Sequence, residues 1–327
     1  MASFRQRNNR WQVRVRRLGF PDQVRTFNLR QDAERWARSI ESDIDRGQFT
    51  NVSLAQQTTL ADLIQKYIQE VLPLKKSFPE DSFRLNALSH KPISKWSMAN
   101  LSPSRIAGYR DERLKQVGNG TVIRELSYIS SIINHARREW GINVANPVLL
   151  VRKPATPEGR NRILNDLERL QLLEALTPVS RGNVWVKPIV QMALETAMRK
   201  GELLSLRWEH IDLVHQTAFL PTTKNGDSRT VPLSLEAIRV LHGLARSING
   251  TVFPITAANL HARFKRAVNR AGLQNFRFHD LRHTAVTNMA KKLPNIIELS
   301  AVSGHKNLGM LKRYYHPDPK QLAQKLG

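Results

Sequence analysis

The sequence predicts a mainly α-helical, multidomain protein with a small β-sheet plus a helix at its N-terminus and a second small antiparallel sheet in its C-terminal half. Three observations lead to this fold class. The 327 residues are enough for two or three domains, each with its own core. Apolar residues recur at helical spacing through most of the chain after residue 57. Two short regions instead show the patterns of strands and hairpin turns.

The composition points to a polyanionic partner. Lys and Arg total 51 against 27 acidic residues, a formal charge of +24, which is typical of proteins that bind nucleic acid. An anionic membrane is the alternative, but no stretch approaches 18 consecutive apolar residues, and the arginine-rich start lacks the apolar core of a signal peptide. The absence of cysteine excludes disulfides and thiolate chemistry. We therefore expect a cytoplasmic, nucleoid-associated protein that binds DNA and no membrane.

Residues 1–52 are predicted to form a basic β-sheet domain. In "RWQVRVRRL", residues 10–18, Trp11, Val13 and Val15 alternate with polar or basic residues, which indicates a strand with one apolar and one basic face. A turn at 19–22, a second strand at 23–29 and a helix at 30–47 follow. A basic ribbon of strands can enter a DNA groove, although a solvated sheet without a partner is the alternative. The candidate DNA-binding residues here are Arg5, Arg7, Arg10, Arg14 and Arg16.

Residues 57–148 are predicted to form a helical domain. The preceding stretch "NVSLAQQ", residues 51–57, is polar and has no apolar period, so it is expected to be a linker. Thr58 or Thr59 can cap the first helix, and Ser102 followed by Pro103 can begin another. A long helix is expected at residues 121–140, ending before Gly141.

Residues 149–162 are predicted to be a basic linker to a third domain, residues 163–327. The linker contains prolines and basic residues without an apolar period. If two lobes enclose a duplex, this segment would run along the phosphates; an ordinary solvated linker is equally consistent with it. The third domain opens with a capping box formed by Asn165 and Glu168. The candidate DNA contacts of the linker are Arg152, Lys153, Arg160 and Arg162.

Two features of the third domain could bind a phosphate. In "LETAMRKGELLSLRW", Arg199 precedes an expected helix break at Gly201, and Glu202 could hold its guanidinium in place. Lys224 lies just before the "NGD" turn of a predicted hairpin. Taken singly, each feature has an ordinary explanation as a helix-end ion pair or a solvated turn residue.

The stretch "FHDLRHT" adds a third feature. His279 and Arg282 share one helix face and can both donate hydrogen bonds to a phosphate. A zinc site using His279 and His283 is the alternative, but the arginine between them would disfavour a cation. Further on, "SGHKNLGMLKRYYH" offers His305 and two tyrosines, and a tyrosine beside such a basic cluster can attack a phosphate.

The ordered set "TAMRKGELLSLRW", "TKNGDSRTVPL", "FHDLRHT" and "SGHKNLGMLKRYYH" resembles the catalytic domain of tyrosine site-specific recombinases, the phage-integrase family, over roughly residues 160 to 320. The resemblance implies an α-rich catalytic domain with a small antiparallel sheet, a helical core-binding domain and an N-terminal arm-type DNA-binding domain. It implies no metal and no other cofactor. The catalytic blocks are also similar to those of shufflon recombinases. Two positions depart from the usual pattern: Ala197 stands where glycine is frequent, and Ser303 where leucine is common.

The resemblance also implies a catalytic set. The family's nucleophile lies two residues before a histidine, which selects Tyr314, with His316, over Tyr315. Tyr314 would form a 3′-phosphotyrosyl bond without ATP, with Lys224 as the general acid. The implied residues around the scissile phosphate are Arg199, Lys224, His279, Arg282 and His305, with Glu202 in support.

The implied partners are double-stranded DNA with specific recombination sites, and further copies of the chain. The resemblance implies a homotetramer on paired sites, a monomer free in solution and an accessory DNA-bending or directionality protein. Integration and excision of a phage or mobile element, in a bacterial or phage context, is the first prediction, and DNA inversion of the shufflon type is the second. A type IB topoisomerase and a non-catalytic DNA-binding regulator are the alternatives from other classes.

Overall fold

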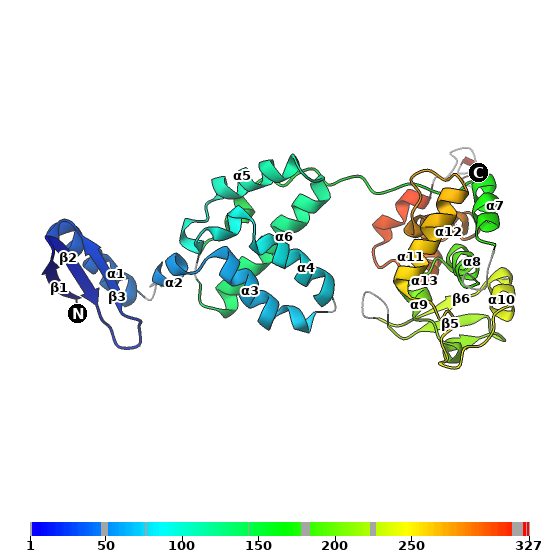
Figure 1. Ribbon diagram of the computed structural model, residues 1–327, viewed down its shortest axis with the longest axis horizontal. Coiled ribbons are helices and arrows are strands. Elements are labelled where there is room, and N and C mark those ends of the chain that lie inside the picture. Colours follow the sequence, from blue (N-terminus) through cyan, green and yellow to red (C-terminus); the bar gives the residue numbers. More distant parts are fainter. Residues whose placement is uncertain are drawn as a thin grey trace. The chain divides into compact units, whose positions relative to one another are not determined.

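The computed structural model describes residues 2–46, 52–75, 77–142, 144–177, 184–222, 227–315, 323, 324 and 326. The chain divides into two units, residues 1–158 and residues 159–327. Across the described ranges, none of the helices is both long enough and apolar enough to cross a membrane. The mainly helical fold with two small antiparallel sheets is the one predicted (Figure 1).

The N-terminal sheet has three strands in the order β1-β2-β3 and packs against one helix. Val13 and Val15 are buried against Ala33 and Ala37 of that helix, which confirms the predicted apolar face. The first strand is an addition to the two strands that the alternation predicted. Gly47, the expected end of the helix, lies outside the described residues. The elements are β1 (Ala2–Arg7), β2 (Arg10–Val15), β3 (Gln23–Phe27) and α1 (Arg30–Asp45).

The rest of the first unit is helical. Thr59 is the N-cap that begins α3, in a capping box with Asp62, and the Ser102 side chain caps α5 with Pro103 at its first position. Buried residues of the helices α3 to α6 form one core with Val148 and Val151, so the start of the predicted linker packs in this core. The helices are α2 (Val52–Gln57), α3 (Leu60–Glu70), α4 (Phe78–Ser89), α5 (Pro103–Leu114) and α6 (Asn119–Glu139).

The prediction of a linker at residues 51–57 is wrong for most of that stretch. Residues 52–57 form α2, and the amide of Thr58 continues the helical pattern by donating to the Leu54 carbonyl at 3.0 Å. Ala55 is 2% exposed and belongs to the core of the helical domain. One small buried side chain in a short segment is too weak a pattern to be recognised as an amphipathic helix.

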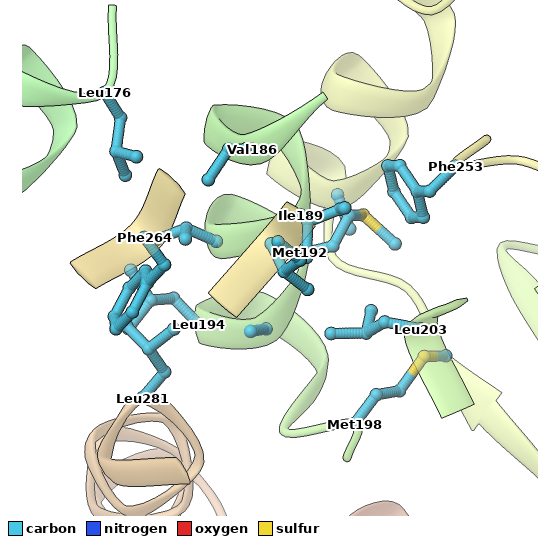
Figure 2. Packing of buried hydrophobic residues seen from close by; sticks show 14 of the residues in the cluster. Leu176, Val186, Ile189, Met192, Leu194, Met198, Leu203, Phe253, Phe264 and Leu281 are labelled. Carbon is cyan, nitrogen blue, oxygen red and sulfur yellow. The ribbon is translucent and has the colours of Figure 1, made fainter. Parts of the chain in front are cut away.

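The second unit is built around α8. Seven of its 11 residues are buried, and it packs against α10, α11 and α12. Figure 2 shows Leu281 of α12 pointing into the same core as Ile189 and Met192 of α8. The helices are α7 (Asp166–Ala175), α8 (Val186–Thr196), α9 (Lys200–Leu204), α10 (Leu235–His242), α11 (Ala257–Arg270), α12 (Phe278–Lys292) and α13 (Ile296–Ser303).

A three-stranded antiparallel sheet completes the second unit. Its order is β4-β5-β6, and Leu220 pairs with Arg229 at the end of the predicted hairpin. The hairpin turn itself, residues 223–226, lies outside the described residues. The strands are β4 (Ile211–Asp212), β5 (Thr217–Leu220) and β6 (Arg229–Pro232).

Candidate active site

The turn between α8 and α9 places Arg199. The helix break was predicted at Gly201, but it occurs at Ala197, which is left-handed with φ 52°, while Gly201 lies inside α9. The methyl group of Ala197 is fully buried. The Thr196 hydroxyl donates to the Met192 carbonyl at 2.6 Å, so this carbonyl in the last turn of α8 has a hydrogen-bond partner. Positive φ is uncommon outside glycine, so the alanine itself does not indicate this turn. The one available signal was that Ala197 stands where glycine is frequent in the resembled family.

Glu202 holds Arg199 in the way that their spacing predicted. Its carboxylate accepts from the Arg199 amide at 2.8 Å and from Arg199 Nη1 at 2.7 Å. Burial alone would raise the pKa of Glu202, but the Arg199 amide and the charges of Arg229 and Arg199 outweigh it, so the pKa is lowered. Glu202 is therefore a carboxylate at neutral pH, although it is only 5% exposed.

Arg229 is a member of this cluster that the sequence did not identify. Its Nη2 donates to Glu202 Oε2 at 2.8 Å, and its Nη1 donates to the carbonyl of Val302 at 3.2 Å. The partners are 27 and 73 residues away in the chain. The one available signal was a basic residue at the start of a short strand, which normally indicates a solvated edge.

Arg282 is buried at the centre of the cluster. It donates to the main-chain carbonyl of Ala197 through Nη1 and to that of Ser303 through Nη2, the latter at 2.6 Å. Burial, followed by the charges of Arg199 and Arg229, lowers its pKa to about 10. Two guanidinium groups thus bind the Glu202 carboxylate, and the charge of a third, Arg282, lies close to it. The excess positive charge favours an anion such as a phosphate.

His305 faces the same arginines. Ser303 Oγ donates to the Leu299 carbonyl at 2.6 Å, so its contact of 2.7 Å with His305 Nδ1 is attractive only if that nitrogen donates. The His305 Nε2 then carries the lone pair and lies 3.4 Å from Nη2 of Arg282. Burial and the charges of the three arginines lower the pKa of His305 to about 4. Ser303, where leucine was expected, therefore adds a polar contact to the site.

Tyr314 lies in a short 3-10 helix, Lys312–Tyr314, beside these groups. Its hydroxyl is 2.6 Å from His283 Nδ1, and its ring centroid is 6.4 Å from that of His305. Burial raises the pKa of Tyr314, and the charges of Arg313 and Arg282 oppose this only in part. The neighbouring Tyr315 donates its hydroxyl to the Leu293 carbonyl at 2.6 Å. His316 lies outside the described residues.

The two histidines of α12 have different positions. His279 is exposed on the first turn, and its ring meets that of His283 edge-to-face at 5.2 Å. From the sequence, His283 was considered only as a zinc ligand, whereas in the structure its Nδ1 contacts the Tyr314 hydroxyl. Within the part of the chain that the structure describes, no group of three or more histidine or acidic residues could hold a metal ion. Lys224, the expected general acid, lies outside the described residues.

Some of the predicted DNA-contact residues lie on exposed surfaces, and others form ion pairs within the catalytic unit. Four of the five predicted N-terminal arginines lie on the sheet face opposite α1, and Arg14 and Arg16 both contact Asp22. Arg152 and Lys153 are exposed in a segment without helix or strand. Arg160 instead binds Asp280 at 2.7 Å, and Arg162 binds Glu168 at 2.8 Å. The residues on the open face are Arg5, Arg7, Arg10 and Arg14.

Comparison with known proteins gives the family. Residues 162–321 match the model of the phage integrase family. The chain is 40% identical over 280 residues to the shufflon-specific DNA recombinase of Escherichia coli, which covers 83% of this chain and 72% of that protein. The chain belongs to the phage integrase family. The recombinase prediction made from the four motifs is therefore confirmed.

Solved structures of integrases show the same fold. A lambda integrase tetramer bound to a Holliday junction matches 96% of this chain and 94% of its own, with a TM-score of 0.67 and 19% identity. The Tn1549 transposon integrase in complex with circular intermediate DNA matches 83% of this chain and 100% of its own, with a TM-score of 0.66 and 17% identity. The predicted fold class is confirmed by these matches.

Proposed function

We propose that this phage integrase family member recombines DNA at specific sites, with Tyr314 as the nucleophile that forms a 3′-phosphotyrosyl intermediate. The observation that carries the proposal is that Arg199, Arg282 and His305 form one cluster and that Tyr314 lies beside it. Arg282 donates to the carbonyl of Ser303, and Arg199 Nη2 lies 3.4 Å from the carbonyl of Gly304, so both guanidiniums face the turn before His305.

The charges of the cluster support attack on a phosphodiester. Negative charge grows on the non-bridging oxygens in the transition state, and two fixed guanidiniums, Arg199 and Arg282, would stabilise it more than the ground state. Loss of either is expected to slow cleavage on the order of 10²-fold or more. Lys224 would protonate the departing 5′ oxygen, and His279 would assist proton transfer. His305 would contact the phosphate.

The substrate in this proposal is double-stranded DNA with specific sites. Strand exchange joins two duplexes, and the family resemblance leads us to propose a homotetramer on paired sites. The same resemblance implies a monomer in free solution and an accessory DNA-bending or directionality protein. The lambda integrase tetramer on a Holliday junction supports this assembly. The basic sheet face with Arg5, Arg7, Arg10 and Arg14 is the proposed additional DNA contact. The protein would act in the cytoplasm, at the nucleoid of a bacterium.

The rearrangement we propose first is integration and excision of a phage or mobile element. The N-terminal sheet domain supports it, because a separate DNA-binding domain can hold a second set of sites. Inversion is the second candidate, since the similar relative in Escherichia coli is named shufflon-specific. Plasmids that carry two sites in direct or inverted orientation, and pairs of plasmids with one site each, separate excision, inversion and integration by the sizes of the products.

Covalent trapping tests the chemistry. A Tyr314→Phe variant first selects a bound duplex from a random-sequence library, and this duplex is then nicked near the cleavage point so that the 5′-hydroxyl fragment diffuses away. The unchanged protein and Tyr315→Phe should form a covalent adduct, and Tyr314→Phe should bind without forming one. An adduct from Tyr314→Phe but not from Tyr315→Phe would exclude Tyr314 as the nucleophile. Binding without any adduct would favour the DNA-binding regulator.

A further inference from the structure

His283 contacts the oxygen that would attack the phosphate. Its Nδ1 lies 2.6 Å from the Tyr314 hydroxyl oxygen, and the two rings are 6.0 Å apart at 30°. A phenol is far more acidic than the N–H of a neutral imidazole, so the phenol donates and Nδ1 accepts. The distance is at the short end for a hydrogen bond, and the proton has a direct path to the nitrogen.

The surroundings prepare both groups for proton transfer. Burial, followed by the charge of His279, lowers the pKa of His283, which keeps the imidazole neutral at pH 7. The pKa of Tyr314 is raised by burial, so the phenol keeps its proton until an acceptor removes it. The titratable and charged groups facing His283 are His279, Asp280 and Arg282 of α12, Arg313 and Tyr314 of the short C-terminal helix, and His305 after α13.

We propose that His283 is the proton acceptor for the nucleophile in DNA cleavage, a role that rests on the proposed function. As the Tyr314 oxygen bonds to phosphorus, its O–H bond breaks and an Nδ1–H bond forms on His283. The bond from phosphorus to the 5′ oxygen breaks, and that oxygen takes a proton from the general acid. In religation the 5′-hydroxyl attacks phosphorus and returns its proton to the general acid. The bond from phosphorus to the Tyr314 oxygen breaks, and His283 returns its proton to the departing phenolate, so the cycle is balanced.

The other histidines near Tyr314 are placed differently. Both ring nitrogens of His305 are engaged, Nδ1 with Ser303 and Nε2 with Arg282. His279 lies one helical turn before His283, and its ring meets that of His283 edge-to-face at 5.2 Å. The Nδ1 of His283 is thus the base in contact with the attacking oxygen.

The first experiment separates proton acceptance from positioning. His283→Asn keeps an amide oxygen near the place of Nδ1, so it can accept the phenol hydrogen bond but cannot take the proton. We expect both His283→Asn and His283→Ala to slow adduct formation on the selected nicked duplex by about 10²-fold or more. Wild-type speed in His283→Asn with loss in His283→Ala would reduce His283 to a positioning residue, and full speed in both would overturn the proposal. Failure of the unchanged protein to form any adduct would instead overturn the proposed function.

A second substrate tests whether His283 takes its proton from the nucleophile or acts on the leaving group. Sulfur in place of the bridging 5′ oxygen makes a leaving group that needs no acid, because a thiol is much more acidic than an alcohol. His283→Asn should remain slow on this substrate, whereas Lys224→Ala should be rescued by it. Rescue of His283→Asn by sulfur would assign the histidine to the leaving group and overturn the proposal.

Fold and pH provide the remaining readouts. Binding of the duplex and the thermal midpoint should be unchanged in His283→Asn, and His242→Asn, at an exposed position on α10, is the matched control with unchanged cleavage. The unchanged protein should lose cleavage rate as the pH falls through the pKa of His283, below the usual 6.5. In His283→Asn that decline should disappear. A decline that persists unchanged in the variant would show that another group titrates.

Discussion

The carboxylate of Glu202 lies 2.8 Å from the guanidinium of Arg229, and the two side chains are only 5% and 12% exposed. Arg199 binds the other oxygen of the same carboxylate at 2.7 Å. A buried carboxylate between two arginines gives each guanidinium one preferred position. Without an anionic ligand the arginines of the cluster repel one another, and the Glu202 carboxylate offsets this repulsion. Glu202 therefore contributes both to the stability of the catalytic domain and to the geometry of the site.

Glu202→Gln is expected to lower both stability and activity. The substitution removes the charge but leaves Arg199 and Arg229 in place, and breaking a buried pair costs on the order of 3 kcal/mol in the free energy of unfolding. Thermal unfolding and the rate of covalent adduct formation measure the two effects. The matched control is Glu236→Gln, which breaks an exposed pair with Arg239 and should change the free energy by less than about 1 kcal/mol. Equal effects of the two substitutions would contradict the role of Glu202.

Gly304 is expected to tolerate no side chain. Its φ is +69°, and an added Cβ would lie 1.9 Å from Nη1 of Arg229, so the arginine has to move. Gly304→Ala should therefore lower the thermal midpoint and also slow cleavage, since Arg229 supports Glu202. Gly272→Ala is the matched control, because it has φ +68° in the same domain but nothing within 4 Å of the new Cβ. It should lower the midpoint through backbone strain alone and leave the cleavage rate of the folded protein unchanged.

The local parts of this site could be predicted from the sequence, and the distant parts could not. Arg199 and Glu202 are three residues apart, so helical spacing was enough to pair them. Arg229 reaches Val302 over 73 residues and His283 reaches Tyr314 over 31, and no periodic pattern reports such contacts. The ordered motifs identified the family and led to the proposed catalytic residues, but the neighbours of those residues required the fold.

The two errors in local structure have the same origin. The helix break was assigned to Gly201 because glycine is the usual breaker, yet the buried Ala197 takes the left-handed position. The short helix α2 was taken for a linker because Ala55 is its single deeply buried side chain in the described part. In both cases the energy of tertiary packing outweighs the local conformational preference. That energy depends on residues distant in the sequence, so a local pattern does not reveal it.

The lowered pKa of His305 predicts a loss of stability in mild acid. Folding lowers the pKa of His305 from its ordinary 6.5 to about 4, so between these values the unfolded chain binds a proton that the folded chain does not. The thermal midpoint of the DNA-free protein should therefore fall as the pH drops from about 6.5 toward 4. His305→Asn should reduce this dependence. A midpoint that is constant over this range would show that His305 titrates normally.

Arg160 and Arg152 are expected to differ in function although both lie in the predicted basic linker. Arg160 forms a two-pronged contact with Asp280, with Nε 3.0 Å from Oδ1 and Nη2 2.7 Å from Oδ2, and the Asp280 side chain is 1% exposed. Arg160→Ala leaves that carboxylate without its arginine, so the thermal midpoint should fall. Its effect on the salt dependence of DNA binding should be small, because the guanidinium is already neutralised.

Arg152 and Lys153 provide the comparison. Both are exposed, so the double substitution Arg152→Ala with Lys153→Ala should leave the midpoint unchanged. Each phosphate contact that is lost reduces the slope of log affinity against log salt by about 0.9, so the pair should reduce it by up to roughly 2. The affinities are measured on the selected duplex in the Tyr314→Phe background, where no cleavage interferes. If Arg160→Ala changes the slope and the double variant does not, the phosphate contact belongs to Arg160, and its ion pair with Asp280 must open when DNA binds.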